Sequence, residues 1–132
     1  MKPLHNYLIY ANEQHYYGLH GMYDFCVEYQ ITEDEANEYG KDMSIGVMES
    51  YSCIMDAMED EVEDLAREEG IAYENLPNQE YEDWMTNALT EIQNENTSWT
   101  CYRLRDDLSK EDKDHIQQLD WEEIRDLYAI KD

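Results

Sequence analysis

The chain has 132 residues, of which 33 are acidic and 9 are basic, so its formal net charge is −24. Such an excess opposes folding by self-repulsion and repels phosphates, which disfavours direct binding to nucleic acid. Three Trp, twelve Tyr and a 42% share of hydrophobic residues are nevertheless enough for a core, unlike the composition of a disordered acidic tail. We therefore expect residues 1–132 to form a single acidic domain.

The negative charge is concentrated in the middle of the chain. Residues 42–95 contain sixteen Asp or Glu and one base, Arg67, which gives this segment a net charge of −15. The next ten residues, 96–105, are slightly positive through Arg103 and Arg105. This distribution indicates a partner with a basic surface, because opposite charges steer two molecules together.

Membrane and secretory segments are not predicted. No window reaches the roughly 18 uninterrupted apolar residues of a membrane helix. The N-terminus, with one Lys and an apolar run of about five residues, does not fit a signal peptide. Cys26, Cys53 and Cys101 are an odd number without a paired framework. We expect reduced thiols in a cytoplasmic protein.

Two strands are predicted at the start of the chain. Asn6–Asn12 is a short apolar and aromatic run, and Tyr23–Ile31 alternates over nine residues, which is typical of a half-buried strand. A turn containing Gly18 and Gly21 would join them into an antiparallel hairpin. Because its alternation is the clearest in the chain, we expect Tyr23–Ile31 to be central or near-central, with its aromatic side facing the core.

Helical signals follow. Thr32 and Glu35 match the capping box, so a helix begins there. Gly40 and Gly46 predict a kink or break, after which a long helix of about 25 residues runs to Gly70. One face of this helix is apolar and the opposite face is acidic. We expect the apolar face to cover the second strand, burying Phe25, Val27 and Tyr29 beneath Ile54, Met58, Val62 and Leu65.

The remaining elements complete a mixed fold. Asn78 is the predicted cap of another helix, Thr97–Leu104 is a β-branched and aromatic strand, and Ser109 and Asp120 cap two short helices. The order ββαα-α-β-αα predicts an α+β domain with a small, three-stranded antiparallel sheet covered on one face by acidic amphipathic helices.

No catalytic or metal site emerges from the sequence. Cys and His side chains could form a nucleophile–base pair, but no local signature supports one, and acidic surroundings raise a thiol pKa. Cys53 points away from the apolar helix face, which predicts a partly exposed thiol. His15, His20 and Cys26 match no zinc spacing, and residues 112–114 lack the Gly and Glu of a calcium loop. We expect no enzyme activity, no cofactor and no metal.

The acidic pattern itself is the strongest functional signal. A helix of about 25 residues spans about 38 Å, and 24 phosphate charges correspond to about 40 Å of duplex DNA. A protein that recognises backbone charge and shape could not easily distinguish the two. The candidate partner-binding residues are Glu49, Asp56, Glu59, Asp60, Glu63, Asp64, Glu68, Glu80, Glu82 and Asp83.

In charge, size and mixed α/β character, the chain resembles the phage and mobile-element inhibitors that imitate DNA, namely anti-restriction proteins, anti-CRISPR proteins and uracil-DNA glycosylase inhibitors. The resemblance implies a protein that occupies the DNA or guide-RNA channel of a host defence nuclease. Four alternatives stay open: a merely solvated helix face, a domain adapted to high salt, a small enzyme, and a regulatory or adaptor protein that binds through its aromatic surface without mimicry. The oligomeric state is also open.

Overall fold

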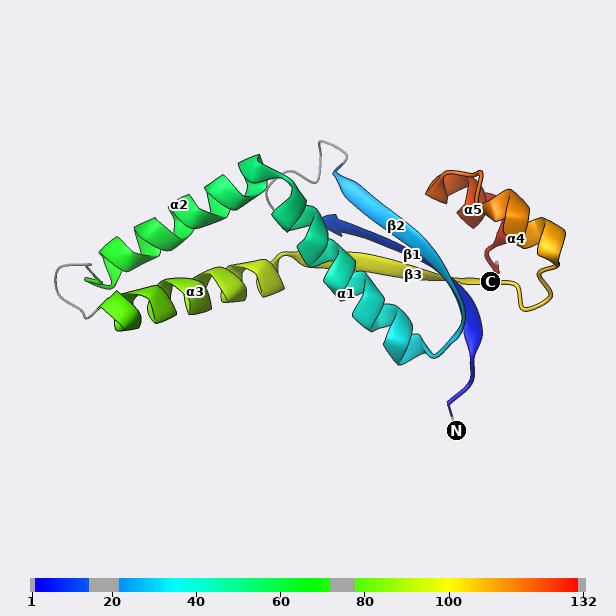
Figure 1. The fold of residues 1–132 in the computed structure, drawn as a ribbon, viewed down its shortest axis with the longest axis horizontal. Helices are drawn as coiled ribbons and strands as arrows, with labels where there is room; N and C mark the ends of the chain where they lie inside the picture. Colours follow the sequence, from blue (N-terminus) through cyan, green and yellow to red (C-terminus); the bar gives the residue numbers. More distant parts are fainter. Residues whose placement is uncertain (1, 15–21, 72–77, 131–132) are drawn as a thin grey trace.

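The computed structural model describes residues 2–14, 22–71 and 78–130. Their α+β class and the predicted order of elements are confirmed (Figure 1). The turn predicted at Gly18 and Gly21 lies outside the described residues. The elements are β1 (His5–Glu13), β2 (Tyr23–Ile31), α1 (Glu33–Ser50), α2 (Ser52–Glu68), α3 (Asn78–Glu95), β3 (Thr97–Leu104), α4 (Lys110–Ile116) and α5 (Trp121–Tyr128).

The three strands form an antiparallel sheet in the order β2-β1-β3. The prediction that β2 is central or near-central was wrong, because β1 occupies the middle and β2 is an edge strand. Consecutive residues Tyr7, Leu8 and Ile9 of β1 are all buried, as expected of a strand covered on both faces. The clear alternation in β2 reflects an edge strand that remains partly exposed.

Helices cover both faces of the sheet, not one. On one face, Tyr7 and Ile9 pack with Ala36 of α1. On the other, Leu8 packs with Ile124 and with further residues of α4, α5 and the end of β3, namely Ile116, Tyr128 and Leu104. The aromatic side of β2 therefore faces α4 and α5: Phe25 and Val27 are partly buried against this second cluster and do not lie beneath α2.

Helix α1 continues through both glycines that predicted a break. It ends at Ser50, and α2 begins after Tyr51, so the predicted 25-residue helix is replaced by helices of 18 and 17 residues. Gly40 is buried against Trp99 of β3: a Cβ at this position would lie 2.3 Å from Trp99 Cδ1. The glycine thus lets the helix approach the sheet closely.

Two polar contacts fix α1 on the sheet beside this glycine. The indole Nε1 of Trp99 donates a hydrogen bond to Asn37 Oδ1 at 2.9 Å. The buried hydroxyl of Ser44 accepts from the Ser98 N–H at 3.0 Å and donates to the Asn12 carbonyl. Ser44 therefore bridges β1 and β3 where these two backbone groups would otherwise pair with each other.

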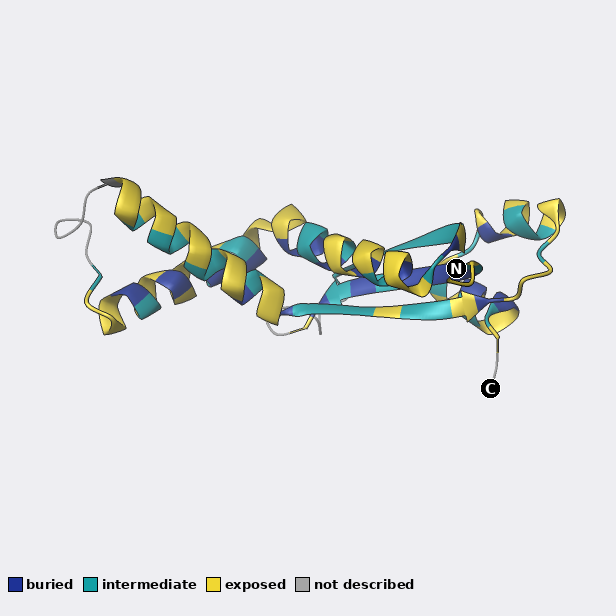
Figure 2. Cartoon of the chain, turned by 90° about the horizontal axis from the view of Figure 1, so that it is seen from below, coloured by how far each residue is buried: buried dark blue, intermediate teal, exposed yellow. Residues whose placement is uncertain are grey.

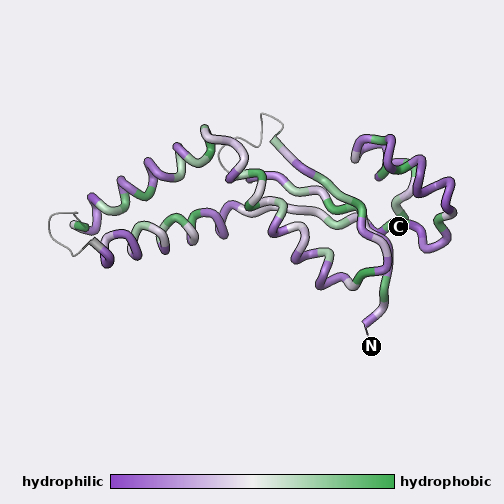
Figure 3. The backbone as a smooth tube through the Cα atoms, viewed as in Figure 1, coloured by the Kyte–Doolittle hydropathy of each residue, from purple (hydrophilic) through white to green (hydrophobic). Residues whose placement is uncertain are grey.

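Helices α2 and α3 form an antiparallel hairpin that projects beyond the end of the sheet (Figure 1). Their facing sides share a cluster of Ile54, Met58, Val62 and Ile92, which also contacts Met48 at the end of α1. Along both helices, short hydrophobic stretches alternate with strongly hydrophilic ones (Figure 3). Gly70, at φ +70, follows the end of α2 as predicted, in a left-handed conformation that suits glycine.

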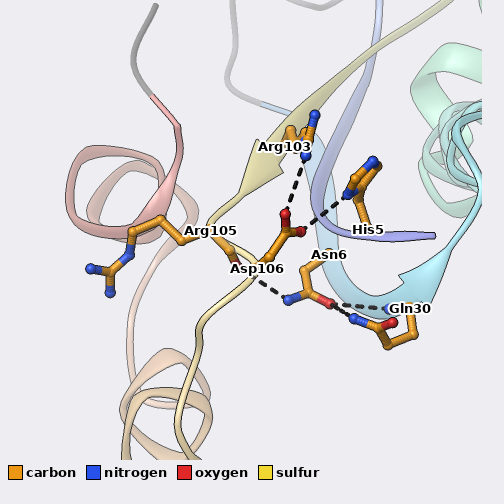
Figure 4. A network of polar contacts seen from close by, with 6 residues as sticks. All are labelled: His5, Asn6, Gln30, Arg103, Arg105 and Asp106. Atoms are coloured by element: carbon orange, nitrogen blue, oxygen red, sulfur yellow. Dashed lines mark hydrogen bonds and ion pairs between the residues drawn. The ribbon is translucent and has the colours of Figure 1, made fainter. Parts of the chain in front are cut away.

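A polar network joins β1 to β2 and to the turn after β3 (Figure 4). The buried Asn6 side chain donates to the Arg105 carbonyl and accepts from the backbone and side-chain N–H groups of Gln30. Asp106 accepts from His5 and from Arg103 at 3.1 and 3.2 Å, and these hydrogen bonds, the one from His5 first, lower the pKa of its carboxyl. The network anchors the turn that leads into α4.

Local capping signals predicted the helix starts well. Thr32 with Glu35 and Asp120 with Glu123 form capping boxes, as expected, and Ser109 forms one with Asp112. Helix α3 begins at Asn78 itself. Each box satisfies two backbone N–H groups that the first helical turn leaves without intrahelical partners.

Gly40 and Gly46 offer a matched test of α1 docking. Gly40→Ala should lower the free energy of unfolding by about 1–3 kcal/mol, because the methyl group would displace Trp99. Gly46→Ala should raise it by about 0.5–1 kcal/mol, because a Cβ there has no atom within 4 Å and alanine favours the helix. Urea unfolding followed by tryptophan fluorescence measures both; a Gly40→Ala protein as stable as Gly46→Ala would contradict the contact.

Candidate functional site

All ten acidic residues predicted from the sequence are exposed, but they do not form one continuous stripe. Glu49 lies in the last turn of α1, whereas the other nine lie on the hairpin of α2 and α3. The break at Tyr51 separates the two groups. Helix α2 carries Asp56, Glu59, Asp60, Glu63, Asp64 and Glu68, and helix α3 carries Glu80, Glu82 and Asp83.

The hairpin also contains acidic residues outside the predicted set. Glu61 on α2 and Glu91 and Glu95 on α3 are exposed as well. With seven acids on α2, five on α3 and one base, Arg67, the two helices have a net charge of −11. Arg67 forms an ion pair with Asp64 at 2.6 Å. These twelve carboxylates, grouped on the two helices, are called the acidic hairpin below.

The dimensions of the acidic hairpin differ from the expected stripe. Seventeen helical residues span about 26 Å, against about 38 Å for the predicted helix. Eleven net charges over this length give about one charge per 2.4 Å, compared with about one per 1.7 Å of duplex DNA. The hairpin therefore approaches the charge density of DNA over a shorter distance.

The packing of α2 on α3 explains why the acids lie outside. Apolar side chains recur every three or four residues on each helix and meet along the hairpin, so the carboxylates are left on the solvent side (Figure 2). On α2, Asp56, Asp60 and Asp64 follow one another at four-residue spacing, where like charges repel. The apolar contact between α2 and α3 must therefore outweigh the repulsion among these carboxylates.

A shallow groove lies along each side of the acidic hairpin. One, of about 190 Å³, has a floor of Leu65, Trp84 and Ala88 and is bordered by Glu69 and Glu91. The other, of about 240 Å³, has a floor that includes Val62 and Leu89 and is bordered by Glu59 and Glu63. An apolar floor beside two carboxylates suits the side chain of Lys or Arg, whose aliphatic stem and charged head need both.

A second candidate surface lies on the face of the sheet that carries α5. The Tyr10 ring lies tilted against those of Trp121 and Tyr23, with ring centroids 4.2 and 5.3 Å apart, and the Tyr102 centroid lies 6.4 Å from that of Trp121. All four rings are partly exposed. Trp121 begins α5, and the sequence did not show that this helix meets the sheet here.

The thiols and histidines of the described residues do not form nucleophile–base pairs. Cys26 contacts Met43, and Cys101 contacts Asn37. Burial raises the pKa of both thiols to about 11, which suppresses the reactive thiolate. His5 contacts Asp106 and His115 contacts the hydroxyl of Tyr128. His15 and His20 lie outside the described residues.

A further cleft, larger than the two grooves, lies between the start of α1 and β3. Its volume is about 720 Å³, and Tyr7, Trp99 and Cys101 are among its lining residues. Its charges are mixed and partly paired: Lys2 pairs with Asp34, and Arg103 pairs with Asp106. The cleft therefore lacks the uniform negative charge that distinguishes the acidic hairpin. Within the described ranges, no group of three His, Cys, Asp or Glu side chains is placed to hold a metal ion.

Comparisons with family models, with curated proteins and with solved structures gave no significant match to this chain. Among the described helices, none is long and apolar enough to cross a membrane. The function must therefore be argued from the surfaces of the chain itself.

Thiol reactivity should separate the three cysteines. Cys53 is exposed, as the sequence predicted, and should react rapidly with Ellman's reagent at about pH 8. Cys26 and Cys101 should react at least about tenfold more slowly, because a pKa of about 11 leaves only about one thiolate in a thousand at that pH. The rapid phase should vanish in Cys53→Ser. Three thiols reacting at a single rate would contradict the burial of the sheet cysteines.

Proposed function

We propose that the protein is a non-catalytic, cytoplasmic inhibitor that imitates nucleic acid and occupies the DNA or RNA channel of a basic host defence nuclease, such as a CRISPR effector or a restriction enzyme. The observation that supports this proposal is the acidic hairpin, which carries twelve exposed carboxylates against one base. The hairpin projects from the sheet, so it can enter a channel while the sheet stays outside (Figure 1).

The electrostatics of the hairpin support competition with nucleic acid. A channel lined with Lys and Arg binds nucleic acid mainly through the negative charge of the phosphates. The carboxylates of the acidic hairpin carry the same negative charge. The grooves beside the hairpin add what phosphates lack, since Trp84 and Leu89 can cover the aliphatic stems of the partner's basic side chains. Such contacts would favour the inhibitor over DNA of similar charge.

The aromatic surface supports a second candidate function. Tyr10, Tyr23, Tyr102 and Trp121 present partly exposed rings, and Tyr and Trp are frequent at the energetic centres of protein interfaces. If the partner binds through this aromatic surface, the chain would be a regulatory or adaptor protein, and its negative charge would serve only to keep it in solution. The two functions differ in which surface the partner needs.

Removing charge from the outer face of α2 tests mimicry. Asp56, Asp60, Glu63 and Asp64 are replaced together by Asn or Gln, which keeps their shape. In cleavage assays with a panel of purified CRISPR effectors and restriction enzymes, the native chain should inhibit at least one. The quadruple variant should associate about tenfold more slowly with that target, because exposed charges mainly steer encounter. Affinity of the native chain should fall as salt rises.

The matched control removes four exposed acids from the other end of the molecule, namely Asp107, Glu111, Asp114 and Glu122. This variant has the same net charge as the first and should inhibit like the native chain. Equal losses in both variants would show that only total charge matters and would contradict a site on the hairpin. Full inhibition by the hairpin variant, combined with loss in Trp121→Ala, would favour the adaptor function instead.

A further inference from the structure

We propose that the free edge of β3 is a homodimer interface, at which β3 of a second copy adds antiparallel and joins the two sheets into one. The inference is independent of the proposed function, because it concerns a different surface. It begins from the two edges of the sheet, which are protected to different degrees.

Strand β2 carries features that discourage pairing with another chain. Asp24 and Glu28 place charges along it, and its register with β1 shifts near Gln30, which has a φ of 56°. Charges and bulges are common protections of edge strands. Residues 97–102 of β3 have no charge and no proline, and they are rich in the β-branched and aromatic residues that favour strands. Figure 2 shows β3 along the margin of the sheet.

Hydrogen bonds at the C-terminal end of β3 show which backbone groups point outward. Arg105 N–H donates to the Tyr128 carbonyl, and Ile130 N–H donates to the Arg103 carbonyl, so residues 103 and 105 face away from β1. By the alternation of an antiparallel ladder, Thr97, Trp99 and Cys101 face the same way. Within the described part of the chain, no backbone group pairs with these three residues on that side.

Charge favours a second copy at this edge. Residues 96–105 contain Arg103 and Arg105 and no acid, so repulsion between two chains of −24 is weakest here. A symmetric antiparallel pairing of the outward residues is centred on Trp99, with Thr97 opposite Cys101 of the other copy. The pairing ends at Cys101, because Ile130 already occupies the outer side of Arg103.

The same arrangement keeps the acidic hairpins apart. Only Asn96 separates the end of α3 from the start of β3, so each hairpin leaves from the N-terminal end of its strand. Because the paired strands are antiparallel, the two hairpins lie at opposite ends of the joined sheet. The segment of Tyr128–Ile130 that pairs with residues 103–105 lies beyond the hydrogen-bonded residues of the proposed interface.

Sedimentation equilibrium tests the dimer directly. At about 0.3 M salt, where charges are screened over about 6 Å, the full chain at about 0.1 mM should have twice the mass of 15.8 kDa. A monomer under these conditions would overturn the proposal, including the case in which the edge serves only a strand from another protein.

Amide exchange locates the interface. In the dimer, the amides of Thr97, Trp99 and Cys101 should exchange at least about tenfold more slowly than in dilute monomer, because they gain hydrogen-bonded partners. The inward amides of Thr100 and Tyr102 should change much less. Uniform protection along β3, or protection confined to another element, would place the contact elsewhere and overturn the proposal.

Discussion

The close contact between α1 and the sheet determines where the hairpin of α2 and α3 begins. Gly40 allows Trp99 to lie against the helix, and the Ser44 hydroxyl inserts between the Asn12 carbonyl and the Ser98 N–H. Steric fit and two hydrogen bonds thereby fix both the distance and the axial position of α1. Because α1 is held in this way as far as Ser44, the chain turns at Tyr51 just beyond the sheet, and α2 starts there. The hairpin projects because α1 cannot slide.

Because the hairpin projects from the sheet, repulsion among its carboxylates does little to destabilise the rest of the fold. Carboxylates crowded on the hairpin repel one another, but they lie outside the clusters that hold α1, α4 and α5 on the sheet. The cost of repulsion therefore falls mainly on the contact of α2 with α3, which Ile54, Met58 and Val62 sustain. Under the proposed function, a basic partner would neutralise these carboxylates and relieve their repulsion. Function and stability would then be opposed only in the free protein and only within the hairpin.

The sequence predicted the features that depend on residues close together in the chain and missed those that depend on distant residues. The capping boxes at Thr32 and Asp120 involve neighbours three residues apart, so the helix starts were readable. Exposure of the acids was readable for the same reason, because it follows helical periodicity. The glycines were misread, since the need for Gly40 comes from Trp99, 59 positions away. Strand order, the covering of both sheet faces, the grooves beside Trp84 and the Asn6 network all depend on distant partners.

The two proposed interfaces share one physical cause, which is the uneven placement of charge along the chain. The hairpin carries many acids, and residues 96–105 have two arginines and no acid, so the proposed basic partner and the proposed second copy would bind different surfaces. Joining two chains along β3 would place one hairpin at each end of a single sheet, and a target with two basic channels could engage both. The second engagement would then be intramolecular, and its strength would depend on whether the spacing of the channels matches that of the hairpins. The rigid attachment of α1 makes that spacing fixed rather than adjustable.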